Sequence, residues 1–565
     1  MKSITIKYIA VFLLFFTAKI GAQNLNWVKS YGGSLEDVGS SISLDNFGNV
    51  YTTGSFRGTV DFDPGSGTAI LNSLGDYDIF VQKMDASGNF QWAKSFGSTG
   101  GDLGYSSTVD ASGNIITTGR FFGTVDFNPG AGISNLTAIG SVDIFIQKMD
   151  ALGNFLWAKN FGGNFVDEGF SITTDLLGNV YTTGSFELIA DADPSAGVFQ
   201  LTAVGAYDIF IQKLDATGNF LWAKSFGGNT YDAGGPLLLD DVGNVYCAGY
   251  FEGSADFDPG SGTTILTSVG LRDIFLQKMD SAGNFVWVKS FGGLSYDGCS
   301  SICKDNLGNI YLTGAFGLTV DFDPGVGVNY ISSLGGYDAF IQKFDTAGNY
   351  LWTKSFGGNM SDGCNSMTID TQGNIYTTGF FEGTADFDPG SGSTNYTPAG
   401  WRDIFIQKLD SVGNFLWVTV FGGSSFDEGL SIKTDLFNNI YTTGYFGATV
   451  DFDPGIGTNN QTATGLYDIY NLKLSQTPTS SNDEISNIIK ISAYPNPTTN
   501  EVQITFEQTI YNVELVLSDI SGAVIFKQTY SQLSSTNIEL KGESNLYILT
   551  INTSEGRVTK ILVKG

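Results

Sequence analysis

The sequence predicts an all-β protein: a seven-bladed β-propeller with four-stranded blades, followed by a small β-sandwich-like domain at the C-terminal end. Three observations indicate this fold class. Tryptophan recurs every 65 residues, and short β-rich runs alternate with Gly, Asp and Asn turns. No segment shows the 3.6-residue apolar period of an amphipathic helix.

The repeated unit contains four β-rich runs, which in the first unit are residues 39–44, 50–56, 78–84 and 90–96. The third run is apolar on consecutive positions, Ile79 to Val81. This predicts a sheet covered on both faces, as neighbouring blades of a propeller cover one another. Seven equally spaced tryptophans mark the fourth run: Trp27, Trp92, Trp157, Trp222, Trp287, Trp352 and Trp417.

The two ends of the array predict a closed ring. A tryptophan-marked strand, residues 26–31, opens the chain, whereas the last third strand, residues 468–474, has no fourth strand after it. An open array would leave unpaired strand edges at both ends, which favour aggregation. We therefore expect the N-terminal strand to complete the last blade.

A recurring core motif, D-x-x-G-N-V-Y-T-T-G, follows the first strand of each unit. Through this motif the chain resembles the bacterial β-propeller repeat family over about residues 24–475. The resemblance implies the architecture and no single activity.

Residues 1–22 are typical of a secretory signal peptide. Lys2 and Lys7 supply the positive start, and the apolar run over residues 8–18 is too short to cross a bilayer. No other stretch is long and apolar enough for a transmembrane segment. Residues 476–486 form a polar linker, after which the 65-residue period disappears.

The last segment, residues 487–565, is β-rich and begins with Tyr494-Pro495-Asn496-Pro497. It continues through a D-x-x-G hairpin at residues 519–522 and ends in a lysine-containing strand. These features resemble the C-terminal sorting domain of the type IX secretion system. The resemblance implies recognition by the type IX secretion machinery, export across an outer membrane, and an extracellular or outer cell-surface location.

The charge balance excludes some partners. With 28 basic and 57 acidic residues the chain carries a net charge of −29, which repels nucleic acid. Histidine is absent, which removes the commonest general base and the commonest zinc ligand. Catalysis by a Ser–His or Cys–His pair is therefore excluded.

The connections of a blade divide into two kinds. Links between the first and second strands, and between the third and fourth, are tight D-x-x-G-N turns, in which Asp and Gly serve the turn itself. The other two kinds of link are longer, and those that join successive units vary between copies. Because antiparallel strands alternate in direction, the variable links share one end of every blade, and we look for binding there.

The long link inside each unit contains a D-F-D-P-G motif for which two hypotheses stand. Paired acids and turn carbonyls could supply oxygen ligands to calcium, or the acids could cap backbone amides in an Asx-type turn. No other cofactor is indicated. The candidate calcium ligands are Asp61, Asp63, Asp126, Asn128, Asp191, Asp193, Asp256, Asp258, Asp321, Asp323, Asp386, Asp388, Asp451 and Asp453.

A second set of acids recurs where each first strand begins. A sevenfold ring of carboxylates could bind cations, but capping of loop amides in each blade is the favoured hypothesis. The members are Asp37, Asp102, Asp167, Asp232, Asp297, Asp362 and Asp427.

Trp401 is the one aromatic residue at a position filled elsewhere by Asp, Ser, Ala, Leu or Gly, so we expect it to be exposed. An exposed aromatic ring offers flat apolar area for stacking on a sugar. With Arg402 beside it, Trp401 is the best ligand-binding candidate.

An active site requires unlike residues that converge once, whereas this chain repeats the same residues seven times. We therefore expect a monomeric, non-enzymatic binding or adhesion protein whose ligand is a glycan or a protein. Two alternatives stay open: a glycosidase or lyase that uses propeller carboxylates, and a structural component of a surface array.

Overall fold

A computed structural model describes residues 23–476, 491–494, 498, 501–519, 524–540, 546–553 and 556–564. All of its regular elements are β-strands, so within these residues no helix is present that could cross a membrane. The chain divides into two compact units, with the division after Gln476. The predicted signal peptide, residues 1–22, and nearly all of the predicted linker lie outside the described residues.

The first unit is a β-propeller in which each 65-residue repeat supplies four strands. The first strands are β2 (Val38–Leu44), β6 (Leu103–Val109), β12 (Glu168–Thr174), β18 (Ala233–Leu239), β24 (Gly298–Lys304), β28 (Asp362–Ile369) and β34 (Glu428–Thr434). The second strands are β3 (Val50–Asp61), β7 (Ile115–Phe121), β13 (Val180–Phe186), β19 (Val245–Phe251), β25 (Ile310–Asp321), β29 (Ile375–Phe381) and β35 (Ile440–Phe446).

The third and fourth strands complete each group. The third strands are β4 (Ile70–Met84), β10 (Asp143–Met149), β16 (Asp208–Leu214), β22 (Asp273–Met279), β26 (Tyr330–Phe344), β32 (Asp403–Leu409) and β38 (Asp468–Gln476). The fourth strands are β5 (Phe90–Phe96), β11 (Phe155–Gly163), β17 (Phe220–Gly228), β23 (Phe285–Gly293), β27 (Tyr350–Gly358), β33 (Phe415–Phe421) and β1 (Gln23–Tyr31).

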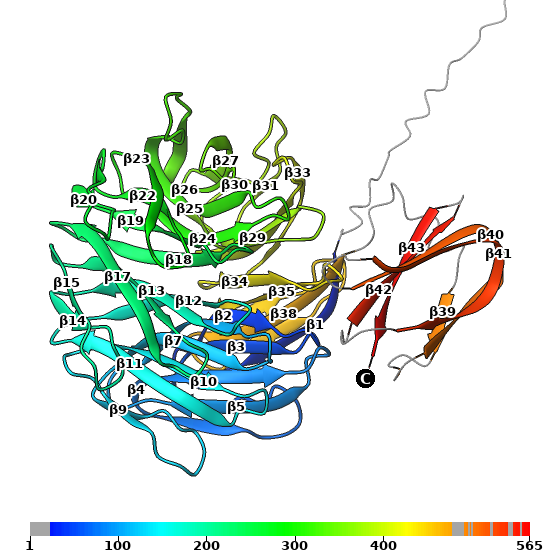
Figure 1. Cartoon of the computed structure of the whole chain (residues 1–565), viewed down its shortest axis with the longest axis horizontal. Coiled ribbons are helices and arrows are strands. Elements are labelled where there is room, and N and C mark those ends of the chain that lie inside the picture. The colour runs from blue at the N-terminus through cyan, green and yellow to red at the C-terminus, as the bar shows by residue number, and fades with distance from the viewer. Residues whose placement is uncertain are drawn as a thin grey trace, which may run out of the picture. The chain divides into compact units, whose positions relative to one another are not determined.

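The four strands of each group pair antiparallel in the order first, second, third, fourth. The group that begins with β34 is completed by β1, because Tyr31 pairs with Ile469 and Gln23 with Gln476. This confirms the predicted pairing of the N-terminal strand with the last third strand. Figure 1 shows the groups arranged around a common centre. The first strands contact one another in chain order, and β34 contacts β2.

The link between the second and third strands forms a short outer hairpin. In two repeats it is continuous with the long strands β3–β4 and β25–β26. Elsewhere it consists of separate strand pairs: β8 (Thr124–Asp126) with β9 (Asn135–Thr137), β14 (Ile189–Asp191) with β15 (Gln200–Thr202), β20 (Ser254–Asp256) with β21 (Ile265–Thr267), β30 (Ala385–Asp386) with β31 (Asn395–Tyr396), and β36 (Thr449–Asp451) with β37 (Asn460–Thr462).

The core lies between neighbouring groups. Ile79 and Val81 of β4 pack with Ile115, Phe121 and Phe145 of the next group, and all five side chains are fully or almost fully buried. The repeated tryptophans add a polar link between groups. Trp92 Nε1, for example, donates to the carbonyl of Ala151 in the next group, at 3.2 Å. Burial on both sheet faces explains why the third strand is apolar on consecutive positions.

The first strands surround a central cavity of about 490 Å³. Serine hydroxyls join these strands across their boundaries. Ser41 Oγ accepts the amide of Ser107 at 3.2 Å, and Ser431 Oγ accepts the amide of Ile42 at 3.1 Å. The second of these bonds joins the last group to the first.

The second unit contains β39 (Ile491–Tyr494), β40 (Glu501–Asp519), β41 (Val524–Glu539), β42 (Leu546–Thr553) and β43 (Gly556–Val563). Among the described residues these strands form one antiparallel sheet in which β40 pairs with β39, β41 and β42. Its buried residues include Leu515, Leu549 and Leu562.

Candidate binding face

The links between strands fall at two ends of the propeller, which we name the turn face and the loop face. The turn face holds the D-x-x-G-N turns. In the turn after β4, Asp85 Oδ1 accepts the amides of Ser87 and Asn89, both at 2.9 Å, and Oδ2 accepts Asn89 Nδ2 at 2.8 Å. Gly88 takes the left-handed conformation, with φ of 77°. The turn-face acids are thus occupied in holding the backbone.

The loop face holds the variable links and the outer hairpins. A buried aspartate ties the two kinds of link together: Asp167 Oδ2 accepts the amide of Gly163 at 2.6 Å, and its Oδ1 accepts the amide of Glu187 at 3.0 Å. Burial raises the pKa of Asp167 to about 7, above its ordinary value of 3.8. The same pair of bonds recurs at every member of the set, Asp37, Asp102, Asp167, Asp232, Asp297, Asp362 and Asp427. The hydrogen bonds confirm the capping hypothesis for these acids.

The D-F-D-P-G acids also accept backbone amides. Asp61 Oδ1 accepts from Asp63 at 3.1 Å and from Ala69 at 2.8 Å, and Asp63 Oδ1 accepts from Gly65 at 2.8 Å. Within the part of the chain that the structure describes, no three His, Cys, Asp or Glu side chains come close enough to hold a metal ion. The loops therefore have Asx-turn geometry, and calcium binding stays a prediction.

Glutamate and arginine are absent from the repeated motifs of the propeller unit. In residues 23–476 both residue types occur only at positions that vary between units, and every one lies at the loop face. These residues are Glu36, Arg57, Arg120, Glu168, Glu187, Glu252, Arg272, Glu382, Arg402 and Glu428. Alignment of the seven copies against one another, with attention to Glu and Arg, is the signal that would have found them.

Trp401 and Arg402 lie at this face just before β32. The Trp401 side chain is 71% exposed, as predicted, and its ring lies nearly parallel to that of Phe426. The ring centroids are 6.1 Å apart, with an angle of 10° between the planes. Phe426 is itself 37% exposed. Together the two rings form an aromatic platform that is open to solvent.

Arg402 supports the platform from within the loop face. Its guanidinium group pairs with Glu382 at 2.8 Å and with Glu428 at 2.9 Å. The guanidinium carbon also lies 3.8 Å from the ring centroid of Phe380, and the ring of Phe426 is 5.9 Å away. Planar cations stack well on aromatic faces. Arg402 is therefore fixed by its neighbours, and its observed contacts are those of a residue that positions the platform.

Two further side chains fix Glu428. Tyr445 Oη donates to Glu428 Oε2 at 2.7 Å, and Asn365 Nδ2 donates to Oε1 at 2.8 Å. The sequence places Phe426 in a variable link but does not pair it with Trp401, and it does not single out Phe380, Glu382 or Glu428. These residues come from different strands and links and become neighbours only in the folded protein. A related cluster forms around Arg272, which pairs with Glu252 at 2.7 Å, but Leu271 stands there in place of the tryptophan.

Comparison with known proteins identifies two families in the chain. Residues 492–564 match a secretion system C-terminal sorting domain, and residues 156–185 match a β-propeller repeat. The sequence resemblances to both families are therefore confirmed. The chain is an exported β-propeller protein, and its type IX sorting domain directs it to the cell surface.

Curated relatives are distant. The chain is 24% identical over 515 residues to an uncharacterized WD repeat-containing protein of Acanthamoeba polyphaga mimivirus, covering 77% of this chain and 36% of the relative. It is 26% identical over 195 residues to the regulatory protein FlaEY of Caulobacter vibrioides, covering 33% of this chain and 20% of the relative. The matches span about a third or less of these relatives.

Two solved structures are similar over large parts of the chain. One is a protein of unknown function from Bacteroides caccae, with 9% identity and a TM-score of 0.26, covering 58% of this chain and 94% of that one. The other is PorZ, a surface component of the type IX secretion system of Porphyromonas gingivalis. It shows 10% identity and a TM-score of 0.17, covering 95% of this chain and all of that one. TM-scores this low do not establish a shared fold.

Proposed function

We propose that this protein is a non-enzymatic, cell-surface binding module that recognises a glycan through the loop face of its propeller. The observation that carries the proposal is the aromatic platform of Trp401 and Phe426. Large aromatic side chains are normally buried, and one that is exposed and backed by a fixed network is typical of a recognition surface. Protein ligands are the alternative, and the experiment below distinguishes them.

The repeat count and strand pairing support a finer description. We propose a closed ring of seven blades over residues 23–475, with β1 completing the last blade. We also propose a small β-sandwich-like sorting domain over residues 487–565 and a monomeric protein. Pairing of β1 with β38 would leave no third strand unpaired, so that only the short outer edges of the blades would remain for a second copy to pair with.

The positions of the carboxylates argue against a glycosidase or lyase. The repeated aspartates of both faces accept backbone amides, and Glu382 and Glu428 are paired with Arg402. A general acid needs a carboxyl group that stays protonated near neutral pH and reaches the substrate. The loop-face aspartates whose pKa is raised, such as Asp167, are buried and accept two backbone amides each, so they do not reach a bound substrate.

Glycan binding is tested with the full secreted chain on an array of bacterial, plant and mucin polysaccharides. Trp401→Ala should weaken binding to the recognised glycan roughly tenfold, because it removes the stacking surface. Leu271→Ala, the equivalent position in another unit, is the matched control and should bind as the unchanged protein does. Equal binding by Trp401→Ala would overturn the platform. Binding to deglycosylated cell-surface and mucin proteins printed beside the polysaccharides, and to no polysaccharide, would establish the protein alternative.

A further inference from the structure

At six of the junctions between successive units, a glycine lies at the end of the fourth strand or two residues after it. At each one, a Cβ atom would overlap the backbone carbonyl of the outer hairpin of the next unit. At Gly163 the clash is with Ile189, at Gly228 with Ser254 and at Gly358 with Thr384. The six residues are Gly33, Gly163, Gly228, Gly293, Gly358 and Gly423. Close backbone approach therefore requires glycine at this position.

Where the approach is closest, the backbones also form a ladder. Gly163 pairs with Ala190 of β14, and Gly228 pairs with Ala255 of β20. Equivalent pairs join β23 to β25 and β27 to β30. These contacts close the space between the end of one unit and the outer hairpin of the next.

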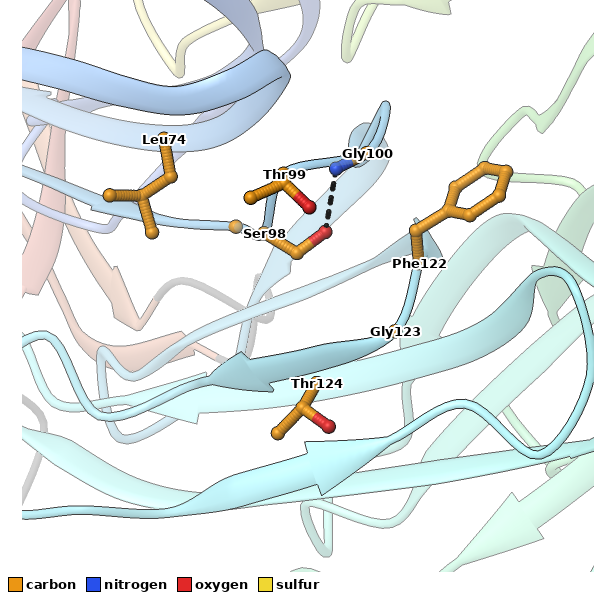
Figure 2. A pocket seen from close by; sticks show the side chains of 8 residues that line it. Leu74, Ser98, Thr99, Gly100, Phe122, Gly123 and Thr124 are labelled. Atoms are coloured by element: carbon orange, nitrogen blue, oxygen red, sulfur yellow. Dashed lines mark hydrogen bonds between the residues drawn. The ribbon is translucent and has the colours of Figure 1, made fainter.

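The seventh junction, between β5 and β8, differs because Ser98 stands where the others have glycine. Strand β5 ends at Phe96, and among the described residues β8 pairs with β9 alone, as β36 pairs with β37 alone at the Gly423 junction. Ser98 is buried, and its Oγ accepts the amide of Gly100 at 3.0 Å (Figure 2). Because a Cβ would overlap the hairpin carbonyl at the six glycine junctions, Ser98 excludes an equally close approach of the two segments here.

The same junction has also lost the side chains that fill the loop elsewhere. Gly100 and Gly101 replace larger residues such as Phe165 and Val166. A side chain at position 100 would collide with Phe122, which follows β7. The result is an open pocket of about 380 Å³, within the usual size range of small-ligand sites.

The pocket wall combines apolar and hydroxyl groups. Leu74 is 68% exposed and Phe122 is 36% exposed, and the hydroxyl groups come from Ser98, Thr99 and Thr124 (Figure 2). None of the described residues that line it is charged, although the chain carries a net charge of −29. An aromatic face beside hydroxyl groups suits a neutral ligand with one apolar face and several hydroxyl groups.

We propose that this junction pocket binds a neutral monosaccharide unit and is a second sugar subsite of the loop face. The inference rests on the proposed glycan-binding function, but it uses residues that are independent of the Trp401 platform. Phe122 supplies the stacking surface, and Thr99 and Thr124 supply hydrogen-bonding groups. Ser98 keeps the junction open, so it is a positioning residue.

The test is ligand-observed saturation-transfer NMR on the full chain with the methyl glycosides of glucose, galactose, mannose and N-acetylglucosamine. Phe122→Ala removes the stacking surface, and Ser98→Gly restores the glycine of the other junctions and should narrow the pocket without unfolding the protein. Each variant should weaken binding of the recognised glycoside roughly three- to tenfold. Glu187→Ala, at the position equivalent to Phe122, is the matched control and should bind as the unchanged protein does.

The outcomes separate the two proposals. If the signal falls in Phe122→Ala and Ser98→Gly but survives in Trp401→Ala, the junction pocket is a sugar site. If it falls only in Trp401→Ala, the pocket inference is wrong while the proposed function stands. If no methyl glycoside gives a signal, the pocket inference is wrong. The polysaccharide array then still tests whether the Trp401 platform binds a glycan.

Discussion

Asp280 of the turn face and Asp232 of the loop face both accept backbone amides, but their pKa values are shifted in opposite directions. At the turn face, Asp280 is well solvated and its pKa is lowered by hydrogen bonds from the amide and side chain of Asn284. At the loop face, burial raises the pKa of Asp232 to about 7, although it too accepts two amides. The same capping role thus has a different energetic basis, because desolvation of the charged form outweighs the hydrogen bonds at Asp232 but not at Asp280.

This difference explains why the loop face can vary. The buried aspartates fix the backbone of both loops in every unit, so the residues above them are free to differ. Glu, Arg and the exposed aromatics occupy those variable positions, whereas the turn face repeats the D-x-x-G-N motif, with Asn438 in place of Gly in one turn. Uniform residues therefore hold the backbone, and the variable residues above them are the candidates for recognition.

Removing one carboxylate from each face tests the difference between the two faces most directly. In Asp167→Ala the amides of Gly163 and Glu187 lose their buried acceptor. The free energy of unfolding should therefore fall by roughly 2–4 kcal/mol. Asp215→Ala exposes turn amides that water can reach, and should lower it by about 1 kcal/mol. Guanidinium denaturation of the full chain measures both. Equal losses would show that burial does not distinguish the two faces.

Much of the fold could be predicted from the sequence because the turn chemistry is local. The first unit's predicted runs agree with β2 and β5 to within a residue, since Asp, Gly and Asn define the turns on either side. The extension of β3 and β4 into the outer hairpin was missed. That extension depends on pairing between Asp61 and Ile70, which the repeat motif does not reveal.

The candidate sites were predicted less well, for a physical reason. Exposure of Trp401 follows from its place in the repeat, but its partner Phe426 lies in the next link and is brought close by the ring. Ser98 is a single departure from glycine whose effect is visible only when the opposing carbonyl is known. Distances across a junction are properties of the closed ring, whereas turns are properties of a few consecutive residues.

The opposite pKa shifts predict that the two faces contribute to stability in different pH ranges. The loop-face acids bind protons more tightly in the folded protein, with the pKa of Asp167 at about 7 and that of Asp37 at about 6, against 3.8 for an ordinary aspartate. Their stabilising contribution is present below about pH 4 and is lost as the pH rises to about 7. The pKa of Asp215 is about 2, where slight burial is outweighed by hydrogen bonds from Asn219 and Thr217, so its contribution is lost only as the pH falls towards 2.

We therefore expect the melting temperature to fall as the pH is raised from about 4 to about 7. It should also fall when the pH is lowered below about 3. Differential scanning calorimetry in about 0.5 M salt measures this, because salt screens repulsion between surface charges but leaves burial unchanged. A melting temperature that rises steadily from pH 4 to pH 7 would show that the loop-face carboxylates are not held in a proton-binding state.

The smallest effect is expected at the D-F-D-P-G loops, where the calcium and turn hypotheses differ. Calcium needs six to eight oxygen ligands, whereas Asp61 Oδ1 already accepts two amides and Asp63 Oδ1 accepts one. The second repeat has Asn128 in place of the second acid, and its oxygen accepts the amide of Gly130 at 2.9 Å, so the turn forms without that charge.

We expect added calcium, followed by excess chelator, to leave the melting temperature of the full chain unchanged, and Asp63→Asn to alter its stability by less than about 0.5 kcal/mol. A saturable rise equivalent to about 2.7 kcal/mol per site at a hundredfold excess over the dissociation constant, reduced in Asp63→Asn, would instead establish a metal site. Because the Asp126/Asn128 loop would then bind more weakly than the others, calorimetric titration would also give fewer strong sites than there are repeats. The turn hypothesis predicts no such inequality between the loops.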